Sequence, residues 1–128
     1  MAINKRKSIT AFELIIVVVI IGLLAAITVP NFRKALIKSR EKLAKANLQM
    51  ILSAQKLYRA SNNSFWKPDP GDSTDLDKIN KALNLDIEDR YFEYSVNYIS
   101  KHDFEAKANS ITDDSIEYTI GPRGFTDD

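Results

Sequence analysis

An apolar run near the N-terminus constrains the fold of this chain more than any other feature. Seventeen of the 21 residues from Ile9 to Val29 are apolar, whereas the 128-residue chain as a whole is 45% apolar. About 20 such residues cross the hydrocarbon core of a bilayer as one helix. Residues 1–8 carry three basic side chains and no acidic one, which predicts a cytoplasmic N-terminal end. We therefore expect one membrane-spanning helix, with the C-terminal part of the chain outside the cytoplasm.

Two simple interpretations of the run are a cleaved secretory signal and a plain uncleaved anchor. A secretory signal has an apolar core of about 7–15 residues followed by small side chains at the cleavage site. The run is longer than that, and Leu24-Ala25-Ala26 is a poor cleavage site. Neither interpretation accounts for Glu13, the one charged residue inside the run.

Glu13 needs an explanation because a carboxylate at the centre of a membrane helix costs about 2.5–3.5 kcal/mol. It lies near the start of the run, so its side chain can reach the lipid headgroups. Alternatively, it has a positive partner, and cleavage after Ser8 creates one. The new α-amino group of Ile9 lies one helical turn before Glu13 and can pair with the same chain or with a neighbour. The residues alone leave both explanations open.

The stretch KSITAFELIIVVVIIGLLAAITVPNF resembles the N-terminus of type IV pilins and of the related type II secretion pseudopilins. Their shared pattern is a short basic leader, a small residue at the cut, Glu at the fifth mature position and an unbroken apolar helix. With Ile9 as the first mature residue, Glu13 is fifth, Gly22 fourteenth and Pro30 twenty-second, all positions that the family favours. The chain departs from the pattern at Ser8, where Gly is usual, and at Ile9, where Phe, Met or Leu is usual.

The resemblance implies a structural subunit of a type IV pilus-like filament, processed by the prepilin peptidase and polymerised through its N-terminal helix. The leader through Ser8 is removed, Ile9 is N-methylated, and Glu13 neutralises the amine of a neighbouring subunit during assembly. The implied partners are identical and related pilin subunits, an inner-membrane assembly platform and, before assembly, membrane lipid. The subunit then starts as a single-pass protein of the inner membrane and ends in a periplasmic or extracellular filament. In such filaments the helix can lose helicity near Gly22 and Pro30.

Two alternatives to a pilus subunit remain. The first is the major pseudopilin of a type II secretion system. The absence of cysteine favours this branch or shorter pilins, because pilus-forming members of the family usually have a C-terminal disulfide loop. The second belongs to another class of protein, a single-span anchored extracytoplasmic binding domain that never polymerises.

Four segments follow from these patterns: a cytoplasmic leader (1–8), a transmembrane and assembly helix (9–30), an amphipathic continuation of that helix (31–60) and an extracytoplasmic globular domain (61–128). Pro30 lacks the N–H that the carbonyl of Ala26 would accept, so we expect the helix to kink or loosen there. Beyond it, helix-forming residues without Gly or Pro extend to about Ala60. One apolar stripe at 3-and-4 spacing consists of Leu43, Met50, Ala54 and Leu57. The sheet is expected to pack where this stripe is widened near its C-terminal end, around Leu48, Ile51, Leu52 and Tyr58.

The globular domain is predicted to hold a loop, a short helix and three strands. Thr74 and Asp77 fit an N-terminal capping pattern for a helix with a stripe at Leu76, Ile79 and Leu83. Apolar and polar residues alternate in three segments, near residues 92–98, 104–108 and 116–120. The fold class is therefore α+β, a long N-terminal helix with a small antiparallel sheet of about three strands packed on its second half.

Composition limits the chemistry of the chain. Its 18 basic and 17 acidic residues give no basic excess for nucleic acid, and no spaced nucleophile–base set points to an enzyme. The charges are nevertheless separated, because residues 33–45 hold six basic and one acidic residue, whereas residues 46–128 hold nine and fifteen. We expect no cofactor, although an acidic loop offers candidate calcium ligands, for which solvated loop or cap positions are the simpler explanation; they are Asp69, Asp72, Asp75 and Asp77.

Overall fold

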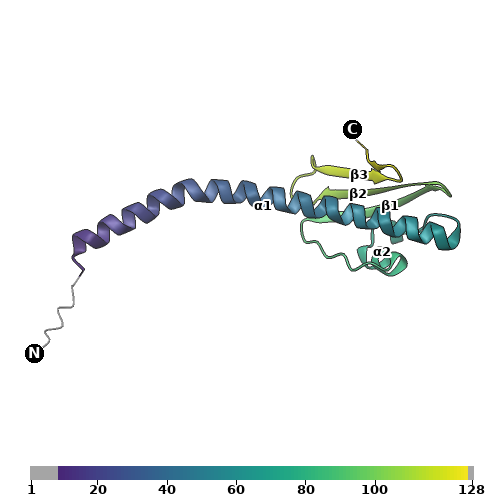
Figure 1. Ribbon diagram of the computed structural model, residues 1–128, viewed down its shortest axis with the longest axis horizontal. Coiled ribbons are helices and arrows are strands. Elements are labelled where there is room, and N and C mark those ends of the chain that lie inside the picture. The colour runs from purple at the N-terminus through teal and green to yellow at the C-terminus, as the bar shows by residue number, and fades with distance from the viewer. Residues whose placement is uncertain (1–8, 127–128) are drawn as a thin grey trace, which may run out of the picture. The chain divides into compact units, whose positions relative to one another are not determined.

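The computed structural model describes residues 9–126 and has an α+β fold, as predicted (Figure 1). The chain divides into two compact units, Met1–Lys38 and Ser39–Asp128. The elements in chain order are α1 (Ala11–Asn62), a 3₁₀ turn η1 (Asp72–Thr74), α2 (Leu76–Leu83), β1 (Phe92–Ser100), β2 (Asp103–Ser110), β3 (Glu117–Gly121) and β4 (Gly124–Phe125).

Helix α1 has 52 residues and ends two residues after the predicted position. Asn63 follows it with φ +58°, a left-handed conformation that Asn tolerates better than most residues. The N–H of Asn63 donates to the carbonyl of Arg59 at 2.7 Å, which satisfies one carbonyl of the last turn. Local backbone geometry, rather than a proline, therefore ends the helix.

The sheet is an antiparallel meander in the order β1-β2-β3-β4. The three predicted strands are confirmed. The fourth strand was not predicted, because two residues are too few to show an alternating pattern. β4 pairs Gly124 with Gly121, and Gly124 has φ +109°, a conformation that residues with a side chain rarely adopt.

One hydrophobic core holds residues 39–126 together. On the inner face of the sheet, large side chains flank the small ones of the central strand: Tyr94 and Tyr118 pair with Ala108. The core also takes side chains from α1, α2 and two loops; its buried members are Ala44, Leu48, Ile51, Ala54, Phe65, Ile79, Leu83, Ile87, Phe92, Tyr94, Val96, Phe104, Ala106, Ala108 and Ile120. Burial of this apolar surface is the main term that stabilises the domain.

The part of α1 that was predicted to contact the sheet is confirmed, but most of the apolar stripe itself is not covered. Leu48 and Ile51 are fully buried, and Leu52 and Tyr58 pack against the core, as predicted. By contrast Leu43, Met50 and Leu57 are 47%, 43% and 71% exposed. The helix carries two adjacent apolar stripes, and the sheet covers only one of them.

Helix α2 begins differently from the prediction. Its N-cap is Asp75 and not Thr74, which belongs to η1. Asp75 Oδ1 accepts hydrogen bonds from the backbone N–H groups of Asp77 at 3.0 Å and Lys78 at 3.4 Å. An ionised cap also interacts favourably with the helix dipole, so Asp satisfies this position better than Thr.

A buried polar network joins α1 to the start of β1. Asn47 Nδ2 donates to Tyr94 Oη at 3.0 Å, and that hydroxyl donates to Asp89 Oδ2 at 2.6 Å. Asp89 Oδ1 accepts from the N–H groups of Tyr91 and Phe92, so both carboxylate oxygens are bonded. Burial, followed by the hydrogen bond to Asp89, raises the pKa of the Tyr94 phenol, which keeps it a donor.

Candidate functional site

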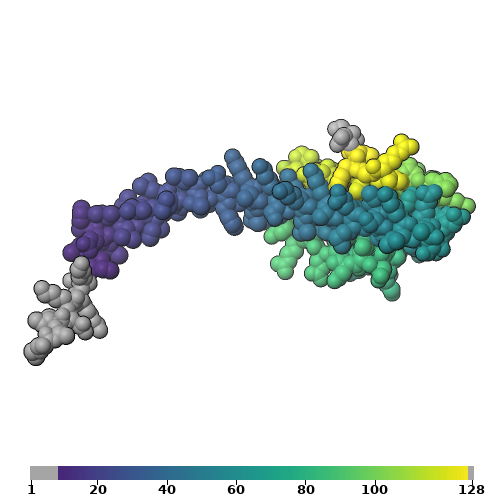
Figure 2. Space-filling model, in the orientation of Figure 1, coloured from purple at the N-terminus to yellow at the C-terminus, as the bar shows by residue number. Residues whose placement is uncertain are grey.

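The first part of α1 presents apolar side chains on all sides. Every residue from Ile9 to Ser39 is exposed, although most of those before Asn31 are apolar. Figure 2 shows these side chains, in purple and blue, standing uncovered along the helix. A soluble helix keeps a polar face toward water, whereas a helix that is apolar all round needs an apolar environment. That environment is not supplied by the described part of the chain.

A bilayer is one environment that fits this segment. Of the helices in residues 9–126, α1 alone is long and apolar enough to cross a membrane, and none of its most apolar 18-residue window is buried. The absence of burial distinguishes it from the core helix of a soluble protein. The same surface also suits a bundle of identical helices, in which each copy covers its neighbours.

Thr10 directly precedes α1 and caps it, a role that sequence reasoning missed. Thr10 Oγ1 accepts a hydrogen bond from the backbone N–H of Glu13 at 3.3 Å, and the carbonyl of Thr10 accepts from Leu14 at 3.1 Å. Thr10 and Glu13 have the Thr-x-x-Glu spacing of a capping box, which could have revealed the cap. This cap places Glu13 in the first helical turn.

The Glu13 side chain is exposed, and no ion pair joins its carboxylate to another described residue. Negative charge in the first turn is favoured by the helix dipole, which offsets part of its cost in an apolar segment. Ile9, one turn away, is also exposed. Ser8, the predicted cleavage residue, lies outside the described residues.

Helix α1 runs through Gly22 and Pro30 without a break in its helical assignment, and the expected kink or loosening at these residues stays a prediction. Around the proline, side chains supply hydrogen bonds to backbone carbonyls. Thr28 Oγ1 donates to the carbonyl of Leu24, and Asn31 Nδ2 donates to that of Ile27 at 3.2 Å. Such bonds are one way in which membrane helices tolerate proline. Loss of helicity in a filament stays a prediction.

Two side chains of the basic segment that follows Phe32 contact aromatic rings of the globular domain. The Arg40 guanidinium lies 3.7 Å from the centre of the Tyr91 ring, and Lys45 Nζ lies 4.7 Å from that of Tyr118. These are cation–π contacts, which orient both side chains toward the sheet. The other basic residues of the segment are exposed: Arg33, Lys34, Lys38 and Lys42.

The four aspartates proposed as calcium ligands do not form a shared site in the structure. Asp75 caps α2, whereas Asp69 and Asp72 border a surface hollow that Lys78 and Lys81 also line. Two lysines oppose the approach of a divalent cation. In the described part of the chain, no group of three acidic or histidine side chains is close enough to hold a metal ion.

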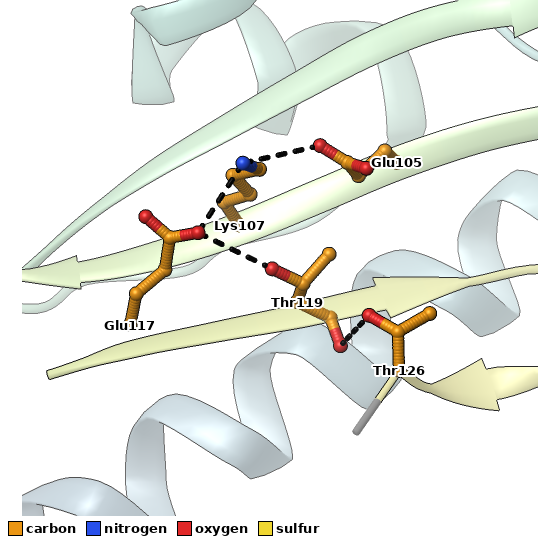
Figure 3. Close-up of polar contacts among 5 residues, drawn as sticks. All are labelled: Glu105, Lys107, Glu117, Thr119 and Thr126. Atoms are coloured by element: carbon orange, nitrogen blue, oxygen red, sulfur yellow. Dashed lines mark hydrogen bonds and ion pairs between the residues drawn. The ribbon is translucent and has the colours of Figure 1, made fainter. Parts of the chain in front are cut away.

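The outer face of the sheet is polar and carries a small charge cluster (Figure 3). Lys107 Nζ lies 3.3 Å from Glu105 Oε1 and 3.2 Å from Glu117 Oε1. Hydrogen bonding to Glu117, and then to Glu105, raises the pKa of Lys107. All three side chains are partly exposed, so the cluster maintains the polar outer face of the sheet and adds little stability.

The similarity of the chain to known proteins lies in about half of its length. No protein-family model matches the chain. The type IV major pilin protein PilA of Myxococcus xanthus is 41% identical over 61 residues, which cover 48% of this chain and 28% of that protein. The type IV wide pilus major component PilA4 of Thermus thermophilus is 36% identical over 62 residues, which cover 48% of this chain and 47% of that protein. The chain thus spans less than half the length of either relative.

The fold and the exposed helix together define a class: proteins with one apolar, uncovered N-terminal helix and one small domain in which a sheet packs on a helix. Both relatives in this comparison are named as type IV pilus components. They confirm the resemblance to the type IV pilin family that the residues around Glu13 indicated.

Proposed function

We propose that this chain is the precursor of a structural subunit of a type IV pilus-like filament. The observation that carries the proposal is the apolar segment from Ile9 through the first part of α1, in which every residue is exposed. A bilayer covers such a helix before assembly, and a bundle of identical helices covers it afterwards. Both relatives bear the names of major pilus components, which supports a pilus over a secretion pseudopilus.

Glu13 sets the register between subunits in this proposal. Removal of residues 1–8 by the prepilin peptidase exposes an amine on Ile9, and N-methylation leaves that amine basic. In an apolar bundle an unpaired charge is strongly disfavoured, so the carboxylate of one copy pairs with the amine of another. The first-turn position of Glu13, which the Thr10 cap sets, keeps both groups at the same end of the helix.

The location of the protein follows from the same segment. Before assembly the chain spans the inner membrane once, with residues 1–8 in the cytoplasm and the domain outside. An inner-membrane assembly platform then moves the helix from lipid into the filament, which is periplasmic or extracellular.

The mature N-terminus tests processing directly. Intact-mass and peptide mass spectrometry of the protein purified from membranes and from sheared filaments should find N-methylated Ile9 as the first residue. A chain that keeps Met1, or one cut near Ala26 as a secretory signal would be, contradicts the proposal. An intact Met1 instead supports the alternative of a single-span anchored binding domain.

The Glu13→Ala substitution tests the charge pair. Membrane insertion should be unchanged, because the substitution makes the segment more apolar, whereas the yield of sheared filaments should fall below detection. Glu93→Ala, on the exposed face of β1, is the matched control and should leave that yield unchanged. Filaments of Glu13→Ala at the wild-type yield would rule out the pairing.

A further inference from the structure

Three basic residues directly follow the uncharged stretch of α1 and form what we call the basic cluster. They are Arg33, Lys34 and Lys38, all with exposed side chains and all within the first compact unit of the chain. At 3.6 residues per turn, the three positions lie within an arc of about 140° around the helix axis. The cluster therefore presents its charge on one side of the helix.

No acidic residue balances the basic cluster. The sequence has no acidic residue between Leu14 and Arg40, and Glu41 is the first one after the cluster. Among residues 9–126, ion pairs are made only by the Lys107 group on the sheet, so the cluster has no counter-charge in this part of the chain. Lys34 and Lys38 are four positions apart, a spacing at which like charges on a helix repel. Anions from outside the chain would relieve that repulsion.

The position of the basic cluster along α1 indicates where such anions come from. The stretch from Leu14 to Phe32 has 19 residues without a charge and is about 28 Å long as a helix. The hydrocarbon core of a bilayer is about 30 Å thick, and the headgroup layer adds about 5–8 Å on each side. When α1 spans a bilayer, Arg33 and Lys34 thus lie at the inner edge of the headgroup layer. Lys38 lies about 7 Å further along, at its outer edge.

Lipid phosphates are the anions of this layer. Lysine and arginine bind phosphate through charge-assisted hydrogen bonds, and anionic membrane surfaces attract basic residues next to a membrane span. A zwitterionic lipid carries a cation beside its own phosphate, so it neutralises the cluster less well than an anionic lipid. An acidic surface of a second copy is the other candidate counter-charge, but it is present only after assembly.

We propose that Arg33, Lys34 and Lys38 bind the phosphate groups of anionic phospholipids at the extracytoplasmic surface of the membrane. The bound headgroups fix the depth of α1 before assembly, and so keep Glu13 at the opposite, cytoplasmic surface. The proposal deepens the proposed function by assigning a lipid class to the unassembled subunit, and it rests on the orientation given there.

Lipid selection by the full chain tests the proposal. The protein is reconstituted in vesicles of phosphatidylglycerol and phosphatidylcholine, and spin-labelled lipids of each kind report the ratio of their association constants at the protein surface. We expect the wild type to select phosphatidylglycerol. Each residue of the cluster that is changed to Gln should lower the ratio by about fivefold, and raised salt should lower it in the wild type.

Two matched variants separate position from charge, and circular dichroism verifies that each variant is folded. One removes the same three charges from exposed positions of the domain and should keep the wild-type ratio: Lys56→Gln, Lys81→Gln and Arg90→Gln. The other exchanges Lys for Arg and Arg for Lys within the cluster and should also keep the ratio. Residues 5–7 are basic too, but every variant contains them, so their contribution cancels in the comparison.

A ratio that survives the triple Gln substitution in the cluster, or that falls equally in the domain control, would overturn the proposal. If that triple variant kept the ratio but formed no filaments, the cluster would instead serve an acidic surface of a second copy. The proposed function can fail separately. A wild-type chain that keeps Met1 and forms no filaments would overturn the function, whereas loss of the ratio with the cluster would still establish the lipid site.

Discussion

The two parts of α1 share one backbone conformation and have opposite surroundings. Up to Ser39 every side chain is exposed, whereas beyond it six side chains are buried, on one face: Ala44, Asn47, Leu48, Ile51, Ala54 and Gln55. Leu23 and Leu48 illustrate the contrast, because the first is 64% exposed and the second is fully buried. The second part is stabilised by its own chain. The first part has no such cover from its own chain, and the proposed function assigns that cover first to lipid and then to other subunits.

The largest expected effect on stability comes from replacing one of these two leucines, and the other provides the direct comparison. Leu48→Ala removes side-chain atoms from the core and should lower the free energy of unfolding of the domain by about 2–5 kcal/mol. Leu23→Ala should leave it unchanged, because Leu23 is largely exposed and does not belong to the core of the domain. Denaturant unfolding of the full chain in detergent micelles, followed by tyrosine and tryptophan fluorescence, measures both. An equal loss from the two variants would show that the two parts of the helix unfold together.

The next largest effect on stability is expected from breaking the polar network that joins α1 to the start of β1. Tyr94→Phe leaves Asn47 Nδ2 and Asp89 Oδ2 without the hydroxyl that links them. Unpaired groups in a buried site should reduce the free energy of unfolding by about 1–3 kcal/mol. Tyr91→Phe is the matched control, since Tyr91 is exposed and its ring still contacts Arg40. If both variants were as stable as the wild type, the network would not contribute to holding α1 on the sheet.

A smaller effect on stability is expected from removing a helix cap, and the caps of α2 and α1 can be compared. Asp75→Ala removes the acceptor of two backbone N–H groups of α2 and should cost the domain about 1 kcal/mol. Thr10→Ala removes a cap of the same kind from α1. It should not change the unfolding of the domain, because residue 10 belongs to the other unit. Hydrogen exchange of α2 amides, together with denaturant unfolding, distinguishes local fraying of α2 from a loss of stability of the whole domain.

The smallest effect is the dependence of stability on pH at the outer face of the sheet. The pKa of Lys107 is raised above its ordinary value of 10.5 in the folded state. Its contribution is therefore fully present below that value and is lost as the pH rises through the folded pKa. Lys107→Met should flatten the decline of the melting temperature in this alkaline range, and high salt should weaken the effect in the wild type. An unchanged pH profile in Lys107→Met would assign the decline to other groups, such as Tyr94.

Much of the fold could be predicted because its signals are local. Alternation located β1, β2 and β3, and continuous helix-forming residues located α1 to within two residues of its C-terminal end. Local signals were insufficient where two of them compete. Thr74 and Asp75 both suit an N-cap, and only the path of the chain through η1 chooses Asp75. Leu57 and Leu48 both follow a helical apolar spacing, and only the position of the sheet decides which is buried.

The candidate site shows the same division. The apolar run, its single acid Glu13 and its similarity to type IV pilins are properties of consecutive residues, so they are available before any folding is considered. The hydrogen bond from the Glu13 N–H to Thr10 is also local and could have been predicted from the Thr-x-x-Glu spacing. The surface hollow beside Met50 and Leu57 could not, because its second wall comes from residues 82–85, more than twenty positions away in the chain.

The sequence by itself determined that this protein has an apolar helix without a polar face, a basic segment after it and an acidic remainder. Helical periodicity and charge depend only on the order of residues, and therefore need no knowledge of contacts. The tertiary structure decided which stripe of α1 enters the core and which aspartate caps α2. Those outcomes depend on which distant segments pack together, because burial is shared between partners and no single segment specifies it.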